Sequence, residues 1–195
     1  MTKLTSRQLQ AIQTKNKIYE TSLSLMELHG YDQITIEQIC RKAGVSVGSF
    51  YNYFKSKNDI LIELYSRADE YFEQEVMPHL TETSMPERIV EYFDSYANFN
   101  VSTGIGTMKQ LYNSNNSLFI HEGRLMQVFL TQMISAGQAK REITASQSPE
   151  YITEFLFIVA RGLIYDWCLH NGEYNLRERM HEMMLPIVGV FREVE

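Results

Sequence analysis

Residues 34–57 of this 195-residue chain read ITIEQICRKAGVSVGSFYNYFKSK, and this stretch decides the fold. Thr35, followed three residues later by Gln38, is the pattern of a capping box, so a helix is expected to begin directly after Thr35. Gly44 tolerates the left-handed conformation that ends a helix sharply, and Ser46 is suited to cap a second helix. Two short helices joined by a tight glycine-containing turn form a helix-turn-helix, which presents its second helix to the major groove of DNA.

The expected second helix, running from Val47 to about Phe54, has two chemically different faces when it is drawn at about 100° per residue. Phe50 and Phe54 fall on one side and are expected to point inward. The opposite side is small, polar and uncharged, so its backbone can approach the groove closely and its side chains can bond base edges. Tyrosines and lysines that follow are suited to phosphate oxygens. The outward set is Gly48, Ser49 and Asn52, with Tyr51 at its margin and Tyr53, Lys55 and Lys57 following.

Charge is distributed unevenly along the chain. Residues 1–57 hold eight Lys and Arg against four Asp and Glu, a net charge of +4. The whole chain carries −6, so residues 58–195 carry −10. A basic N-terminal quarter on an acidic body predicts that this end meets a polyanion. The alternative, a tight helical hairpin with a serine-rich exposed face and no role in DNA binding, leaves this polarity unexplained.

Residues 10–57 resemble the DNA-binding domain of the tetracycline-repressor (TetR) family of bacterial one-component regulators. The resemblance is carried by the pattern T-I-x-x-I-x-x-x-A-G-V-S-x-G-S-F-Y-N-Y-F-x-S-K at residues 35–57. Many members of the family have a polar or basic side chain where this chain has Val47, so we expect weak base readout there. The resemblance implies phosphate contacts from Thr35 and Ser46, base contacts from Val47, Gly48, Ser49 and Asn52, and further phosphate contacts from Tyr51, Tyr53 and Lys57.

Composition places the chain among ordinary soluble globular proteins, with 44% hydrophobic and 22% charged residues. No stretch approaches the roughly 18–20 apolar residues needed to cross a bilayer, and the N-terminus lacks the apolar segment of a signal peptide. Cys40 and Cys168 lie far apart in helical patterns, as expected of reduced thiols. We therefore expect a cytoplasmic protein without membrane contact.

Helix-start signals and apolar periodicity predict an all-α chain of about nine helices. An N-terminal three-helix domain is expected at residues 1–56, followed by a helical effector-binding and dimerisation domain at residues 57–195. The first helix of the second domain is expected to act as a rigid strut between the two. The predicted helices span about residues 5–29, 35–43, 46–54, 57–76, 84–100, 107–112, 121–138, 148–170 and 175–191, the last bent or broken near Pro186.

Residues 85–133 are rich in methionine and aromatic side chains and poor in charge. This composition fits either an ordinary bundle core or a ligand cavity with an apolar lining. The family resemblance favours the cavity, because its members bind a small molecule in this domain, and the scarcity of charge predicts a neutral or weakly polar lipophilic effector. The candidate pocket residues are Tyr92, Phe93, Tyr96, Met108, Tyr112, Met126, Phe129 and Met133.

The last two predicted helices carry apolar stripes wider than one chain needs to bury. The resemblance implies that they pair with their copies in a four-helix dimer interface, although completion of the monomer core is the alternative. A twofold dimer also places two recognition helices about 34–36 Å apart on a palindromic DNA site. The candidate interface residues are Phe155, Ile158, Val159, Trp167, Met184 and Phe191.

No constellation for catalysis or metal binding is recognisable in the sequence. The five histidines lack carboxylate or thiol partners at ligand spacing, and Asp166 with His170 fits an intrahelical hydrogen bond better than a metal site. We therefore expect no enzyme, no cofactor and no metal. The sequence predicts a homodimeric regulator, a repressor that leaves a palindromic operator when a small lipophilic effector binds. The alternatives are an activator of the same fold, control by a protein partner, or a helical ligand carrier with a vestigial DNA-binding domain.

Overall fold

The computed structural model describes residues 5–112, 119 and 124–193. Over these residues the chain forms nine α-helices and no β-strand, which confirms the all-α prediction. A π-helical turn, Phe72–Val76, and a short 3-10 helix, Met77–His79, continue the fourth helix. The α-helices are α1 (Ser6–His29), α2 (Ile36–Ala43), α3 (Val47–Tyr51), α4 (Asn58–Tyr71), α5 (Met85–Thr103), α6 (Ile105–Leu111), α7 (Leu125–Ala139), α8 (Pro149–Leu169) and α9 (Leu176–Gly189).

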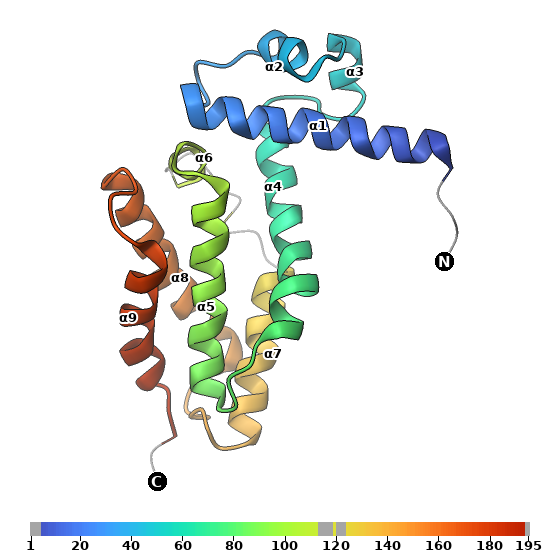
Figure 1. Cartoon of the computed structure of the whole chain (residues 1–195). Helices are drawn as coiled ribbons and strands as arrows, with labels where there is room; N and C mark the ends of the chain where they lie inside the picture. Colours follow the sequence, from blue (N-terminus) through green and yellow to red (C-terminus); the bar gives the residue numbers. More distant parts are fainter. Residues whose placement is uncertain (1–4, 113–118, 120–123, 194–195) are drawn as a thin grey trace.

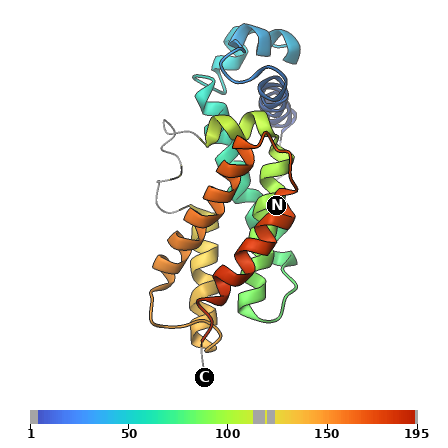
Figure 2. The ribbon, with the colours of Figure 1, turned by 90° about the vertical axis from the view of Figure 1, so that its left-hand side faces the viewer.

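The helices form a small domain at one end of a longer bundle (Figure 1). Helices α1, α2 and α3 make up the small domain, and α4 leads from it into the bundle of α5, α7, α8 and α9. The view turned by 90° shows α8 and α9 side by side along one face of this bundle (Figure 2). No helix of the described ranges is long and apolar enough to span a bilayer.

The helix-turn-helix forms through the local signals predicted from the sequence. The Thr35 hydroxyl accepts a hydrogen bond of 3.2 Å from the backbone N–H of Gln38, whose side chain accepts one of 2.8 Å from the N–H of Thr35. Gly44 ends α2 in the left-handed conformation, with φ 65° and ψ 38°. Ser46 caps α3 by accepting from the N–H of Ser49 at 3.0 Å. The capping box, the glycine turn and the serine cap are confirmed.

Helix α3 is shorter than predicted, because it ends at Tyr51 instead of Phe54. The next three residues form a hydrogen-bonded turn, in which the N–H of Phe54 still donates to the carbonyl of Phe50 at 3.0 Å. The side chains of Phe50 and Phe54 are 0% and 2% exposed. Their predicted inward orientation is confirmed, so the outward residues of this segment keep a fixed register.

Three other helix boundaries differ from the prediction. Helix α5 continues to Thr103 and ends at Gly104, which has φ 96°, and α6 follows two residues earlier than expected. Helix α7 begins at Leu125 among the described residues, and the predicted start at residues 121–123 lies outside them. Of the two predicted alternatives at Pro186, a bend or a break, the break is wrong, because α9 runs through the proline. Glu182 and Pro186 are both exposed, so water can bond the carbonyl that the proline leaves unpaired.

A polar network ties α1 to α4. The carboxylate of Glu63 accepts hydrogen bonds from Lys15 of α1 at 2.7 Å and from Arg67 of its own helix at 3.2 Å. Arg67 in turn donates to the side chain of Asn16 at 2.6 Å and lies over the ring of Tyr19. Burial acts to raise the pKa of Glu63, but the hydrogen bonds and charges of Lys15 and Arg67 outweigh it, and the pKa is lowered. The small domain is therefore joined firmly to the helix that enters the bundle.

Candidate nucleic-acid interface and ligand cavity

The outward face of α3 lies on the surface of the small domain. Gly48, Tyr51 and Asn52 are exposed, and Val47 is 39% exposed, whereas Ser49 is half-buried. None of the five carries a charge. A Cβ on Gly48 would have the hydroxyl oxygen of Ser46, 3.9 Å away, as its nearest neighbour. A groove surface can therefore approach the helix backbone closely.

Two cap hydroxyls flank this face. Thr35 and Ser46 are exposed, and each hydroxyl oxygen accepts a hydrogen bond from its own helix. The Ser46 hydroxyl still has its own proton to donate, whereas the Thr35 hydroxyl is also hydrogen-bonded to the carboxylate of Glu37. Both groups lie at helix N-termini, where unpaired backbone N–H groups favour anions. Their position therefore suits contacts with phosphate oxygens.

Lys57 has a structural role that the sequence did not reveal. Its ammonium donates to the backbone carbonyls of Tyr31 and Ile34, both at 2.8 Å, and lies 4.5 Å from the centre of the Tyr31 ring. Lys57 therefore ties the loop between α1 and α2 to the start of α4. Two of the three ammonium protons are used in this way, and one remains for a phosphate. Lys55 is exposed, and Tyr53 is half-buried against the core.

A cavity of about 30 Å³ lies between the strut helix α4 and the helices α5, α6 and α7. This volume has room for about one water molecule. Its wall is mostly apolar and includes one face of α4, which enters the small domain at its other end. The lining residues are Leu64, Tyr65, Ala68, Tyr96, Phe99, Asn100, Met108, Leu111, Tyr112, Phe119, Arg124 and Met126.

Half of the predicted pocket residues line this cavity, namely Tyr96, Met108, Tyr112 and Met126. The other four do not. Tyr92 and Phe93 are fully buried in an aromatic cluster with Phe157, Met133 is buried and Phe129 is half-buried. These four residues belong to the bundle core, the alternative that the sequence had left open.

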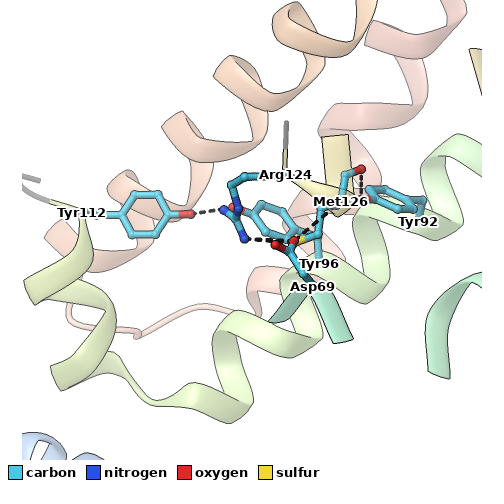
Figure 3. A network of polar contacts seen from close by, with 6 residues as sticks. All are labelled: Asp69, Tyr92, Tyr96, Tyr112, Arg124 and Met126. Atoms are coloured by element: carbon cyan, nitrogen blue, oxygen red, sulfur yellow. Dashed lines mark hydrogen bonds and ion pairs between the residues drawn. The ribbon is translucent and has the colours of Figure 1, made fainter. Parts of the chain in front are cut away.

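Four residues of the cavity wall, Tyr96, Tyr112, Arg124 and Met126, take part in a network of polar contacts (Figure 3). The hydroxyls of Tyr96 and Tyr112 lie 3.0 Å apart, and burial raises the pKa of both, so both remain protonated and neutral. Arg124 pairs with Asp69 of α4 at 3.3 Å, and its guanidinium lies 4.4 Å from the centre of the Tyr65 ring. The segment is poor in charge, but Arg124, which directly precedes the apolar helix α7, folds into the cavity wall.

The outer face of α8 carries a row of exposed apolar side chains at helical spacing. Phe155 is 39% exposed and Ile158 is 56% exposed, and Val159 beside them is half-buried. Tyr151, Tyr165 and Leu169 extend the row, with exposed Gly162 at its middle. A surface of this kind typically marks a protein–protein contact.

Three predicted interface residues instead lie within the chain. Met184 is fully buried, Trp167 is 5% exposed and Phe191 is 8% exposed. The indole N–H of Trp167 donates to the carbonyl of Tyr174 at 3.1 Å. Buried side chains offer almost no surface to a partner, so these three residues leave the candidate interface. The wide apolar stripe predicted that most of each helix surface is buried. It did not distinguish the part buried by the same chain from the part buried by a partner.

The described residues contain no group of three His, Cys, Asp or Glu side chains placed to hold a metal ion. Cys40 and Cys168 are free and buried, and burial raises the pKa of Cys168 to about 11. A thiol with this pKa is protonated near neutral pH and is a poor nucleophile. Asp166 bonds the Tyr174 hydroxyl at 3.0 Å and lies 3.5 Å from His170, on the exposed surface.

Comparison with known proteins agrees with the geometry. Residues 18–64 match the sequence family described as bacterial regulatory proteins, tetR family. The fatty acid metabolism regulator protein of Bacillus subtilis is 22% identical over 167 residues, which cover 82% of this chain and 86% of that protein. The transcriptional regulator EthR of Mycolicibacterium smegmatis is 29% identical over 96 residues, which cover 46% of this chain and 44% of EthR.

Solved structures share the whole fold. The regulator FadR of Bacillus subtilis, solved with stearoyl-CoA, superposes with a TM-score of 0.74 and 20% identity over 89% of this chain and 96% of FadR. A crystal structure from Syntrophomonas wolfei, described as that of a TetR-family transcriptional regulator, gives a TM-score of 0.74 and 23% identity over 92% of this chain and 94% of that chain. The two ends of the molecule, helix-turn-helix and bundle, thus occur together in other regulators.

Proposed function

We propose that this chain, a member of the tetR family of bacterial regulatory proteins and hence a DNA-binding transcriptional regulator, is a repressor released from a palindromic operator by a lipophilic effector. One observation carries the proposal. Helix α4 forms a wall of the cavity and also carries the small domain with the outward face of α3. A ligand that moves this wall moves the DNA-binding end.

The proposed DNA contacts follow from the geometry of the small domain. The small outward face of α3 would meet base edges, and Asn52 is suited to adenine. The exposed hydroxyls and ammonium groups around that face would hold phosphates. The base-facing residues are Val47, Gly48, Ser49 and Asn52, and the phosphate-facing residues are Thr35, Ser46, Tyr51, Tyr53 and Lys57.

A homodimer formed through α8 and α9 is part of the proposal. Phe155, Ile158 and Val159 supply apolar surface that water would otherwise cover, and Gly162 leaves room for a second helix to approach. A twofold pair presents two recognition helices to the two halves of a palindrome. We place such a regulator in the cytoplasm, where bacterial DNA lies.

The small size of the cavity means that an effector must change the arrangement of the helices around it. About 30 Å³ does not hold a lipophilic molecule, so an effector must part α4 from the facing helices. It therefore binds the parted arrangement and not the closed one, and this difference in affinity is what shifts a population. A coupling of about 1–3 kcal/mol changes operator affinity by roughly 5–150-fold.

An acyl compound is the effector class that we propose. The apolar part of the wall, with Leu64, Met108, Leu111 and Met126, suits an alkyl chain. The similar Bacillus subtilis protein is a fatty acid metabolism regulator, and the similar FadR structure holds stearoyl-CoA. Both observations support the same class for this chain.

A mobility-shift assay with the DNA that flanks the chain's own gene tests the proposal. We expect a shifted complex of a dimer with that DNA, and its loss when long-chain acyl compounds are added. A complex that no acyl compound disrupts would favour an activator or control by a protein partner. Binding of acyl compounds without any affinity for DNA would favour the ligand carrier.

A further inference from the structure

We propose that Arg124 receives an anionic end group of the effector, and that it does so in exchange for Asp69. The exchange would release α4 from the start of α7. This inference rests on the proposed ligand-responsive function and adds to it a charge at a defined end of the ligand and a defined contact that the ligand breaks.

Arg124 is the charged residue of the described cavity wall. Its side chain is only 16% exposed, and its guanidinium lies against the face of Tyr65. The hydroxyls of Tyr96 and Tyr112 nearby are neutral, and their mutual hydrogen bond uses one of their two protons. The other proton can donate to an acceptor. A cation and a hydroxyl donor at one side of an apolar space form a receptor for an anion on an alkyl chain.

Asp69, which does not itself line the cavity, is the anion that Arg124 holds in this structure. Its Oδ1 accepts from Arg124 at 3.3 Å and from the backbone N–H of Met126 in the first turn of α7, also at 3.3 Å. Figure 3 shows this carboxylate from α4 reaching across to both groups. Because Asp69 belongs to α4 and its two partners belong to the start of α7, this carboxylate joins the two helices.

The contact between Arg124 and Asp69 leaves another anion able to compete for the guanidinium. The hydrogen bonds of the Arg124 guanidinium within the described ranges run through one nitrogen, Nη2, to Asp69 and, at 3.6 Å, to the sulfur of Met126. A guanidinium has five N–H donors and binds a carboxylate most strongly through two parallel bonds. A ligand carboxylate or phosphate that forms the paired arrangement replaces a longer, single contact.

The exchange explains how a ligand in the cavity acts on DNA. While Arg124 holds Asp69, α4 stays against α7 and the wall stays closed. When Arg124 turns to a ligand anion, Asp69 loses its cation, and the part of α4 that faces the cavity loses a polar link to the bundle. A neutral lipophilic molecule of the same length offers Arg124 no anion in place of Asp69, so it gains nothing from the exchange and is expected to bind more weakly.

Binding by the full-length wild-type chain is the first test, and it needs no variant. Calorimetry would compare dodecanoate and dodecyl phosphate, each below its critical micelle concentration, with dodecan-1-ol below its solubility limit. We expect at least one of the two anions to bind about tenfold or more tightly than the alcohol, which is the scale of one charge-assisted hydrogen bond. The two anionic probes distinguish a carboxylate from a phosphate as the preferred end group. Equal binding of all three, or binding of none, would overturn the inference.

Variants then assign the effect to the two residues. Arg124→Met is expected to bind all three probes equally, whereas Asp69→Asn is expected to bind the preferred anion several-fold more tightly and the operator more weakly without ligand. Arg179→Gln, which removes an exposed arginine of α9, is the matched control and should behave as wild type. If Arg124→Met does not fold, Asp69→Asn and the wild-type comparison decide, and unchanged anion affinity in Asp69→Asn contradicts the exchange.

Operator binding by the ligand-free wild type keeps the two proposals distinguishable. Its absence contradicts the proposed repressor function, while the preference among the three probes still decides the role of Arg124. Conversely, normal operator binding with no preference for an anion rejects only the inference.

Discussion

The carboxylate of Glu27, in the last turn of α1, accepts a hydrogen bond of 2.7 Å from the backbone N–H of Gly106, in the first turn of α6. A Cβ on Gly106 would lie 2.9 Å from the Cα of Glu27, so the two backbones touch at this point. Helix α6 also supplies Met108 and Leu111 to the cavity wall. The small domain is therefore joined to the cavity by a second route, separate from α4.

Replacing Glu27 with alanine should weaken this second route. We expect Glu27→Ala to lower the free energy of unfolding by about 1 kcal/mol, the scale of one hydrogen bond, and to leave effector affinity nearly unchanged. The factor by which the effector weakens operator binding should fall. Operator affinity measured with and without effector checks this, with Glu20→Ala, an exposed carboxylate of the same helix, as control. If the effector weakened operator binding by the same factor in Glu27→Ala as in wild type, the coupling would run through α4 alone.

A methyl group on the recognition helix should harm DNA binding without harming the fold. The Cβ of Gly48→Ala would lie 3.9 Å from its nearest neighbour, the Ser46 hydroxyl, and alanine favours helix more than glycine by up to about 1 kcal/mol. We therefore expect equal or higher thermal stability and an operator affinity reduced about tenfold or more, because the methyl occupies the space of close approach. Full affinity in a stable Gly48→Ala protein would mean that this face does not enter the groove.

Two neighbouring lysines should separate stability from phosphate binding. Lys57→Gln loses two ammonium–carbonyl bonds and should lower the free energy of unfolding by about 1–2 kcal/mol, whereas Lys55→Gln, at an exposed position, should lower it hardly at all. Log K for DNA binding falls as log salt concentration rises, and each change should make this slope shallower by about one if each lysine contacts one phosphate. Equal stability of the two variants in urea would rule out the structural role of Lys57.

The Glu63 network makes the docking of α1 on α4 sensitive to acid. The folded-state pKa of Glu63 lies below its ordinary value of 4.5, so its contribution to stability is present above about pH 4.5 and is lost as the pH falls through the folded-state pKa. Glu63→Gln should therefore be less stable than wild type by about 1 kcal/mol at pH 7, a value kept small because the pair is partly solvated. Urea titrations at pH 7 and pH 3.5 should show this difference shrinking at the lower pH; a constant difference would refute the assignment.

A charge on the outer face of α8 should separate the proposed dimer. Ile158→Glu places a carboxylate in the middle of the exposed apolar row and should give a monomer in light scattering, with weaker operator binding. Ile62→Glu, at a residue of α4 that is 44% exposed, is the matched control and should remain dimeric. If Ile158→Glu and wild type have the same mass in solution, the interface lies elsewhere.

The parts of the fold that were predicted correctly depend on neighbours in sequence. Thr35 with Gln38, Gly44, and Ser46 make their decisive contacts within five residues, so the pattern alone places the helix-turn-helix. The inward pair Phe50 and Phe54 follows from helix periodicity in the same way. Local rules therefore sufficed for the helix-turn-helix.

The parts that were not predicted depend on contacts distant in sequence. Arg124 enters the cavity wall because Asp69, 55 residues earlier, pairs with it, and Lys57 bonds carbonyls 23 and 26 residues away. The sequence predicted that Trp167 and Met184 face a partner, but their own chain buries them. Their burial depends on helices distant in sequence, so it could not be predicted from α8 and α9 alone. No window of the sequence contains this information.

The salt dependence of DNA binding decides whether this chain holds a specific duplex through phosphate contacts. The full-length chain would be titrated against a labelled duplex from the flank of its own gene at several salt concentrations, with fluorescence anisotropy as readout. We predict that log K falls linearly with log salt concentration, since phosphate contacts release counterions, and that an unrelated duplex binds about 1000-fold more weakly. Absence of measurable affinity for the flanking duplex, even at low salt, would contradict the account.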